Sequence, residues 1–174
     1  MKLASIQTPH GPRAALAVAD GYIDLHATDP GLPACVKDLL AASPAVRKAA
    51  AEVASHPHAV KYAANAVKLL PPVTSPSKIM CVGLNYRDHA IEGNRPIPTE
   101  PVIFGKFANA LCGPGDPIIL PRVAEKVDYE AELVVVIGRR GKNIPNTDAA
   151  FGFVGGYTVG HDVSARDWQF RGDE

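Results

Sequence analysis

The sequence predicts an α+β protein that is mostly β, with a small N-terminal α+β domain followed by a larger strand-rich domain. Residues 1–70 combine short apolar segments with alanine-rich stretches, which indicates strands followed by helices. The segment LLPPVTSPSK at 69–78 carries three prolines and two serines, a composition typical of a linker. Beyond it, glycine and proline separate apolar runs, which favours strands interrupted by brief helices. We therefore expect domains at 1–70 and 71–174.

The first domain should begin with a hairpin and continue with two helices. Residues 2–7 and 13–25 have the composition of short strands, and Asp20–Gly21 is a turn signal inside the second segment. Helices are then expected within 33–43 and 44–56. Each of these alanine-rich stretches opens on a proline, which suits a first helical turn.

The second domain should be built from five strands and a terminal helix. Ser164 and Asp167 have the spacing of a capping box, which predicts that a helix opens there. The sequence stops just as this helix starts, so we expect part of the domain to be absent from the chain. The five expected strands lie within 78–86, 101–107, 116–121, 129–138 and 153–163.

Charge and cysteine content argue against several classes of function. Lys+Arg and Asp+Glu number 18 each, so no net field would attract nucleic acid or an acidic membrane. The apolar stretches fall short of the ~20 residues that a membrane span needs, and the N-terminus lacks the apolar core of a signal peptide. Cys35, Cys81 and Cys112 are widely spaced and should be buried, reduced thiols. These features predict a cytoplasmic protein.

Two glutamates precede an apolar run in the stretch DYEAELVVVIG at 128–138. Residues i and i+2 of a strand share a face, so Glu130 and Glu132 should point the same way, roughly 6–7 Å apart. The strand is apolar on both faces farther along, which predicts that it is buried and that the two carboxylates line the mouth of an interior space. Like charges held there require a counter-charge.

A proton, a basic side chain or a metal ion would each supply that counter-charge. Lys126, Arg139 and Arg140 lie nearby in the sequence and would form salt bridges. Oxygen ligands alone favour a hard cation such as Mg²⁺, Mn²⁺ or Ca²⁺. Asp162 ends a short strand and would complete a set of three carboxylates, whereas Asp167 is assigned to the capping box.

A histidine and a glutamate form a second candidate group. If Asn85 or Asp88 caps a short helix that Gly93 ends, His89 and Glu92 at i and i+3 share one face of it. A carboxylate beside an imidazole raises its basicity, as a general base requires, although a surface pair has the same spacing.

A lysine inside the strand expected at 101–107 is the last candidate. Lys106 would bind a carboxylate or enolate of a substrate, or serve as an edge charge that discourages aggregation. No Gly-x-Ser-x-Gly elbow and no Gly-x-Gly-x-x-Gly or phosphate loop occurs, which argues against a serine hydrolase and against a dinucleotide or ATP cofactor.

Five motifs in this order resemble the fumarylacetoacetate hydrolase family. The resemblance implies a mixed β-roll catalytic domain that forms a homodimer. It also implies Mg²⁺ or Mn²⁺, with Ca²⁺ as an alternative in crystals, held by Glu130, Glu132 and Asp162. The motifs, which cover roughly 78–169, are KIMCVGLNYRDHA, EPVIFGKF, GPGDPIILP, DYEAELVVVIGRRGKNI and GGYTVGHDVSARDWQ.

The resemblance also implies roles for four further residues. His89 and Glu92 match a pair on a short helix or lid that activates water or shuttles a proton. Lys106 and Gln169 match positions that contact the carboxylate or oxo group of the substrate. In the family, a lysine-bearing segment follows SARDWQ and closes the roll, so we expect the C-terminal part of the roll to be absent here.

The function implied by the resemblance is divalent-metal-dependent hydrolysis of a C–C bond in a β-diketo acid, of the acylpyruvate or fumarylacetoacetate type, through a metal-stabilised enolate. The same chemistry would serve an isomerase, decarboxylase or hydratase of a 2-oxo-dioate in aromatic catabolism. A third interpretation is a truncated, non-catalytic family member that acts as a binding partner. The expected partners are a small oxo acid and a second copy of the chain, with no nucleic acid and no membrane.

Overall fold

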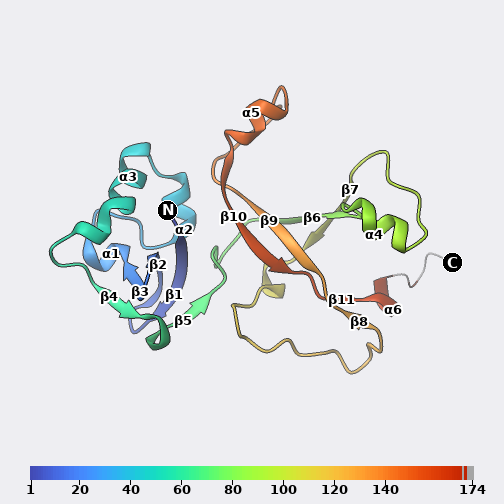
Figure 1. Cartoon of the computed structure of the whole chain (residues 1–174), viewed down its shortest axis with the longest axis horizontal. Coiled ribbons are helices and arrows are strands. Elements are labelled where there is room, and N and C mark those ends of the chain that lie inside the picture. Colours follow the sequence, from blue (N-terminus) through green and yellow to red (C-terminus); the bar gives the residue numbers. More distant parts are fainter. Residues whose placement is uncertain (170, 172–174) are drawn as a thin grey trace.

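The computed structural model describes residues 1–169 and 171. One five-stranded antiparallel sheet occupies the N-terminal part of the chain, and three separate two-stranded pairs follow it (Figure 1). The helices are short and few, so the prediction of an α+β, mostly β protein is confirmed. None of the helices in this described part is long and apolar enough to span a bilayer.

The N-terminal sheet has the strand order β4-β3-β2-β1-β5. The expected hairpin is present, because Val18 pairs with Gly21 and the two residues between them form the turn. The linker begins inside this sheet, since β5 takes up the first two residues of 69–78. The strands are β1 (Leu3–Thr8), β2 (Gly11–Val18), β3 (Gly21–Asp24), β4 (Lys61–Ala63) and β5 (Lys68–Leu70).

Three α-helices and two 3-10 turns lie beside this sheet. Ser43 caps α3 and Pro44 is its first residue, as expected. Cys35 caps α2 instead, so the prediction that Pro33 opens the earlier helix is wrong. The elements are α1 (Leu25–Thr28), α2 (Val36–Ala41), α3 (Pro44–Glu52), η1 (Val53–Ser55) and η2 (Ala64–Ala66).

A closed hydrophobic core lies between these helices and the sheet. Ile23, Leu25 and Leu39 are buried in it and come from a strand and two helices. Burying side chains of this size stabilises a fold by about 1.5–3 kcal/mol each. Residues after β5 are tied to this unit, because the Ser5 hydroxyl donates to the Pro72 carbonyl at 2.8 Å. The N-terminal part of the chain therefore has a complete core of its own.

The C-terminal part contains three antiparallel pairs, β6 with β7, β8 with β11, and β9 with β10. The longest is the β9–β10 ribbon, which runs diagonally through the centre of the view in Figure 1. The segment 116–121 forms no strand, so that expectation is wrong. The strands are β6 (Ile79–Gly83), β7 (Val102–Lys106), β8 (Val127–Asp128), β9 (Ala131–Ile137), β10 (Val154–His161) and β11 (Ser164–Ala165).

The helices of this part are single turns or little more. Gly93 ends α4 as expected, but the helix begins after Tyr86 with no side-chain cap, so neither Asn85 nor Asp88 has the predicted capping role. Ser164 lies in a strand, so the predicted capping box is also wrong. The elements are α4 (Arg87–Glu92), η3 (Ala108–Ala110), α5 (Thr147–Phe151) and α6 (Arg166–Gln169).

The C-terminal strands leave most of their apolar side chains exposed. Among the apolar side chains of residues 79–169, Ala90 is the one that is buried. Leu133 is 61% exposed and Val159 is 82% exposed, in the centre of the longest ribbon. The prediction that the 129–138 strand is buried on both faces is therefore wrong, because residues 1–169 and 171 supply no second layer over that strand.

Candidate active site

The register of the β9–β10 ribbon places three carboxylates on one face. Glu132 lies opposite Gly160, and the backbone N–H of Asp162 donates to the carbonyl of Glu130 at 3.0 Å. Residues opposite each other in an antiparallel pair point to the same side, as do residues two apart in one strand. Glu130, Glu132 and Asp162 therefore share a face, which we call the acidic face.

Arg166 gathers the polar groups at one end of the acidic face. Its guanidinium donates to Oε1 of Glu130 at 2.5 Å and, through Nε, to Oδ2 of Asp128 at 3.0 Å. Nη1 donates to Oε1 of Gln169 at 2.9 Å. Burial lowers the pKa of Arg166, but its bonds to the two carboxylates outweigh burial and leave the pKa above its ordinary value. The hydrogen bond from Arg166 in turn lowers the pKa of Asp128.

Asp162, which lies opposite Glu130 in the ribbon, meets the β6–β7 pair. Lys106 forms an ion pair with Oδ1 of Asp162, an oxygen that is buried and receives no hydrogen bond of ordinary geometry. Lys106 lies opposite Ile79, and Cys81 is two residues along the strand from Ile79. Cys81 and Lys106 therefore point to the same face of the β6–β7 pair. Burial raises the pKa of the Cys81 thiol, and the negative charges of Asp162 and Glu132 add to the effect. Cys81 is therefore a protonated thiol beside the carboxylates.

The acidic face fits a hard divalent cation in donor chemistry. Its donors are carboxylate oxygens, which Mg²⁺ and Mn²⁺ prefer. Gly160, opposite Glu132, has no room for a side chain, since a Cβ at that position would lie 2.7 Å from Cγ2 of Val134. In residues 1–169 and 171, however, no three acidic, histidine or cysteine side chains stand close enough together to hold an ion.

Cationic side chains instead contact two of the three carboxylates. The sequence left a basic partner open as an alternative to metal, and that alternative is present at Glu130 and Asp162. The partners are Arg166 and Lys106, not the sequence neighbours Lys126, Arg139 and Arg140 that were expected. Metal ligation by Glu130, Glu132 and Asp162 therefore stays a prediction.

The short helix α4 carries the expected histidine and glutamate on exposed positions. His89 lies near the same cluster, because its charge adds to the effect of Arg166 in lowering the pKa of Asp128. Glu92 is the last residue of the helix. The structure thus places His89 toward Asp128, and the expected pairing of His89 with Glu92 stays a prediction.

Sequence reasoning missed three residues of this site. Arg166 and Asp128 are separated by 38 positions and meet because β8 pairs with β11. The third is Cys81, predicted to be a buried thiol, which is only half-buried and borders the carboxylates. Asp167 also has another role than expected, because its carboxylate accepts the backbone N–H of Glu125 at 2.9 Å. Long-range pairing of this kind has no local signal in the sequence.

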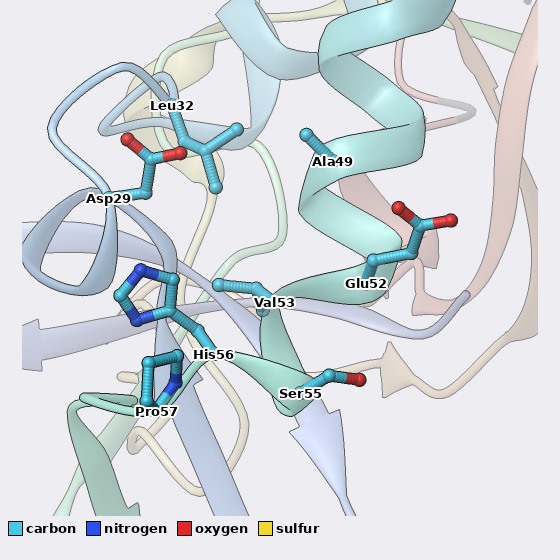
Figure 2. A pocket seen from close by; sticks show the side chains of 8 residues that line it. All are labelled: Asp29, Leu32, Ala49, Glu52, Val53, Ser55, His56 and Pro57. Carbon is cyan, nitrogen blue, oxygen red and sulfur yellow. The ribbon is translucent and has the colours of Figure 1, made fainter.

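Neither of two hollows in the surface is lined by the carboxylates of the acidic face. One of about 330 Å³ opens in the N-terminal part, where Asp29, Glu52 and His56 stand at its edge (Figure 2). Two of these polar side chains already bind the backbone of neighbouring residues. Asp29 accepts a hydrogen bond from the N–H of Gly31, and His56 accepts one from the N–H of His58. A second hollow of about 260 Å³ lies beside Lys106. The first hollow therefore offers no set of free ligands.

A family comparison agrees with the motifs that form the site. The family model described as "Fumarylacetoacetate (FAA) hydrolase C-terminal" matches residues 78–173. The match includes the acidic face, α4, Lys106 and Arg166. The chain therefore belongs to the fumarylacetoacetate hydrolase family.

The relatives of this chain are named as enzymes, and the reactions differ from one relative to another. A protein of Xenopus laevis named "Oxaloacetate tautomerase fahd2, mitochondrial" is 46% identical over 176 residues, which is 98% of this chain and 54% of that protein. The structure of a 5-carboxymethyl-2-hydroxymuconate delta-isomerase from Mycobacterium smegmatis matches with a TM-score of 0.69 and 32% identity, over 100% of this chain and 59% of that one.

A third relative is a maleylpyruvate hydrolase from Sphingobium sp. SYK-6, solved in complex with manganese (II) ion and pyruvate. It matches with a TM-score of 0.75 and 26% identity, over 95% of this chain and 60% of that one. The chain spans about half the length of the curated relatives it matches. The agreement with these structures supports the predicted fold with an incomplete roll.

The expectation of a cytoplasmic location is wrong in the light of these relatives. The matching proteins from Xenopus laevis, Bos taurus and Homo sapiens are all named as mitochondrial. The expectation relied on the N-terminal residues, which lack the apolar core of a secretory signal. Mitochondrial targeting uses a different, amphipathic signal, so that criterion does not discriminate between the two locations.

Proposed function

We propose that this chain carries the catalytic residues of an enzyme that interconverts the enol and keto forms of a 2-oxo diacid, with oxaloacetate as the first candidate. The observation that carries the proposal is the acidic face with Lys106 and Arg166 against it, in a chain 46% identical to a named oxaloacetate tautomerase. The reaction needs a negatively charged enol oxygen to be stabilised while a proton moves to or from the neighbouring carbon.

Glu130, Glu132 and Asp162 would hold a Mg²⁺ or Mn²⁺ ion, as the family resemblance implies and as the manganese in the maleylpyruvate hydrolase supports. When bound, the ion would supply positive charge that favours the ionised enol. The residues have the required chemistry, because all three are carboxylates on one face and the buried Oδ1 of Asp162 lacks a regular hydrogen bond.

Basic side chains of the site would orient the diacid. Lys106 and Arg166 already contact carboxylates of the chain, so each is placed to exchange that partner for a carboxylate of the substrate. Arginine binds a carboxylate through two parallel N–H bonds, which fixes its orientation. Gln169, held by Arg166, would contact the oxo group. Such positioning supplies much of the rate enhancement in reactions of bound substrates.

His89 would move the proton. In the enol-to-keto direction, the enol O–H loses its proton and the adjacent carbon gains one, so the net change is a shift of one proton and of the double bond. An imidazole suits this step, because its ordinary pKa of about 6.5 lets it accept and donate protons near neutral pH. Glu92 would raise the basicity of His89 when α4 covers the substrate.

A direct assay tests this function. The decay of enol oxaloacetate, followed by its ultraviolet absorbance, should be accelerated by a protein containing this chain together with Mg²⁺. Glu132→Gln should abolish the acceleration, and Glu100→Gln, which alters an exposed carboxylate outside the site, should leave it unchanged. Equal rates for the parent protein and Glu132→Gln would refute the proposal.

Hydrolysis of a C–C bond in a β-diketo acid is the second candidate, favoured by the manganese and pyruvate complex of the maleylpyruvate hydrolase. The same ionised enol is then the leaving group when water attacks the second carbonyl. Release of pyruvate from an acylpyruvate, detected by a coupled dehydrogenase, distinguishes this reaction from tautomerisation. Pyruvate release that depends on Glu132, with no effect on enol decay, would favour hydrolysis.

A further inference from the structure

Two of the three carboxylates of the acidic face are paired with cations of the chain itself. Nζ of Lys106 contacts Oδ1 of Asp162, and Nη2 of Arg166 contacts Oε1 of Glu130 at 2.5 Å. Among residues 1–169 and 171, no basic side chain forms an ion pair with Glu132. The acidic face therefore offers a divalent cation one unpaired carboxylate and two whose charge is already balanced.

Arg166 is fixed firmly in its place. Its guanidinium donates to three side chains, those of Asp128, Glu130 and Gln169. Its backbone N–H donates to the carbonyl of Lys126 at 2.8 Å, beside the pairing of β8 with β11. A planar guanidinium with several partners keeps its orientation when one of them is withdrawn. Arg166 is therefore a permanent part of the site.

Lys106 is held much less firmly than Arg166. Within the described part of the chain its ammonium forms one ion pair, with Asp162. The side chain of Lys106 is 31% exposed, so water can solvate the ammonium when that contact is broken. Lysine is also a compact charge on a flexible four-carbon stem. Of the two cations at the acidic face, Lys106 is the one that can leave.

Oδ1 of Asp162 is a poor candidate for sharing between two cations. The oxygen is buried and receives no hydrogen bond of ordinary geometry, so the ammonium of Lys106 is its charge partner. Two positive charges in contact with one oxygen repel each other strongly where protein atoms displace water. Ligation of a divalent cation through this oxygen therefore requires that Lys106 be released from it.

We propose that Lys106 is a displaceable counter-ion of the acidic face, which pairs with Asp162 and is released when a divalent cation binds. The ion pair lowers the affinity of the face for that cation, because the apparent affinity falls with the fraction of molecules in which the ligand oxygen is free. The inference rests on the proposed function, since it presumes a metal site on this face. Release from Asp162 would then free Lys106 for a carboxylate of the substrate.

A static role for Lys106 predicts an effect of the opposite sign. If the ammonium held the carboxylate of Asp162 in position for a cation, removing the ammonium would weaken cation binding, as loss of a group that orients a ligand does. If the ammonium competes with the cation, removing it strengthens the binding. The direction of the change in affinity separates the two roles and requires no measurement of activity.

Titration with Mn²⁺, followed by electron paramagnetic resonance, measures that direction. Lys106→Met removes the charge and retains an unbranched side chain, and it should bind Mn²⁺ about 10-fold more tightly than the parent chain. Lys106→Arg keeps a positive charge and should bind no more tightly than the parent. Lys142→Met removes an equal charge from an exposed position outside the site, and it should change the affinity by less than about 2-fold because water and salt screen that charge.

A second measurement uses the parent chain. Acetylation of Lys106 by an amine-reactive ester, read by peptide mass spectrometry, should be severalfold faster in Mg²⁺ than in EDTA, because the ammonium leaves its carboxylate. Acetylation of Lys142 should be the same in both. If the circular dichroism spectrum of Lys106→Met differs from that of the parent, this measurement decides alone.

The outcomes separate this inference from the proposed function. Mn²⁺ binding that is lost in Asp162→Asn, but is no tighter in a folded Lys106→Met than in the parent, would overturn the displacement and leave the metal site in place. Acetylation of Lys106 at equal rates in Mg²⁺ and EDTA would do the same. Absence of Mn²⁺ binding in both the parent and Lys106→Met would refute the displacement and the proposed metal site together.

Discussion

Residues 1–70 and residues 79–169 use similar apolar side chains in opposite ways. In the first region, Leu25 and Leu39 are fully buried between a five-stranded sheet and its helices. In the second, Leu133 on the β9–β10 ribbon is 61% exposed. The first region has five strands in one sheet, whereas the second has three separate pairs. A core thus depends on how many layers the chain can assemble, and composition alone does not decide it.

The comparison also shows where the polar chemistry is concentrated. In the first region, the hydroxyl of Thr28 accepts a hydrogen bond from the N–H of Val60, and the buried Asp24 caps α1, so polar groups stabilise the fold. In the second region, Arg166 and Lys106 contact three carboxylates of the chain. Polar groups in the region without a core are therefore concentrated around one ribbon, whereas those of the first region stabilise its fold.

The sharpest way to test the difference is one substitution made in both regions. Leu39→Ala removes a fully buried side chain and should lower the free energy of unfolding by about 2–5 kcal/mol. Leu133→Ala removes the same atoms from an exposed position and should change it by no more than about 0.5 kcal/mol. Urea denaturation followed by circular dichroism measures both, and equal losses would contradict the contrast between the regions.

A second test weakens the polar network of the C-terminal region. Arg166→Gln removes charge-assisted hydrogen bonds to Asp128 and Glu130, so the pairing of β8 with β11 should become weaker. Because Arg166 is the main cause of the lowered pKa of Asp128, that pKa should also rise toward about 3.9. Carboxyl carbon NMR titration measures it, with Arg140→Gln as the control. An unmoved Asp128 pKa would show that the contact is absent in solution.

A smaller effect is expected when Asp167 is replaced, because it changes the exchange of two loop amides. Its carboxylate accepts backbone N–H groups of Glu125 and Lys126, which fastens the preceding loop to α6. Asp167→Asn keeps the shape but weakens both bonds, because charged acceptors bind more strongly than neutral ones. Amide exchange at Glu125 and Lys126 should become severalfold faster, while exchange in β1 stays unchanged. Unchanged exchange at both amides would mean that the loop is held by other contacts.

The smallest effect on stability is expected from the protonation of Asp116 at low pH. The ion pair with Lys68 lowers the pKa of Asp116, so this carboxyl binds a proton more readily in the unfolded chain than in the folded one. Its contribution to stability is present above the unfolded pKa of about 3.9 and is lost as the pH falls through the lower folded pKa. Asp116→Asn should therefore destabilise the protein slightly at pH 7 and not at pH 2, as measured by thermal unfolding.

Short-range features were well predicted from the sequence. The turn near Asp20–Gly21, the start of α3 at Pro44 and the end of α4 at Gly93 depend on a few neighbouring residues with special backbone preferences. The strand β9, which carries Glu132 and begins directly after Glu130, was also recognised by its alternation. Such signals are local, so they do not require knowledge of which segments meet.

The features that were predicted wrongly depend on distant contacts. Ser164 and Asp167 matched a capping box, but Ser164 pairs with Asp128 in a strand and Asp167 binds a loop 42 residues away. The counter-charge for Glu130 comes from Arg166, 36 residues along the chain, and not from a neighbour in the sequence. The expected burial of 129–138 presumed a second layer, which residues 1–169 do not supply.

Binding of a divalent cation to the acidic face tests the account most directly. Titration of the chain with Mn²⁺ by electron paramagnetic resonance should reveal one bound ion per chain. Asp162→Asn should weaken that binding on the order of 100-fold, since it removes a ligand oxygen, whereas Asp148→Asn in the exposed α5 should not change it. Binding that is equal in the parent protein and in Asp162→Asn would contradict a metal site on this face, and its carboxylates would then serve only as partners for Lys106 and Arg166.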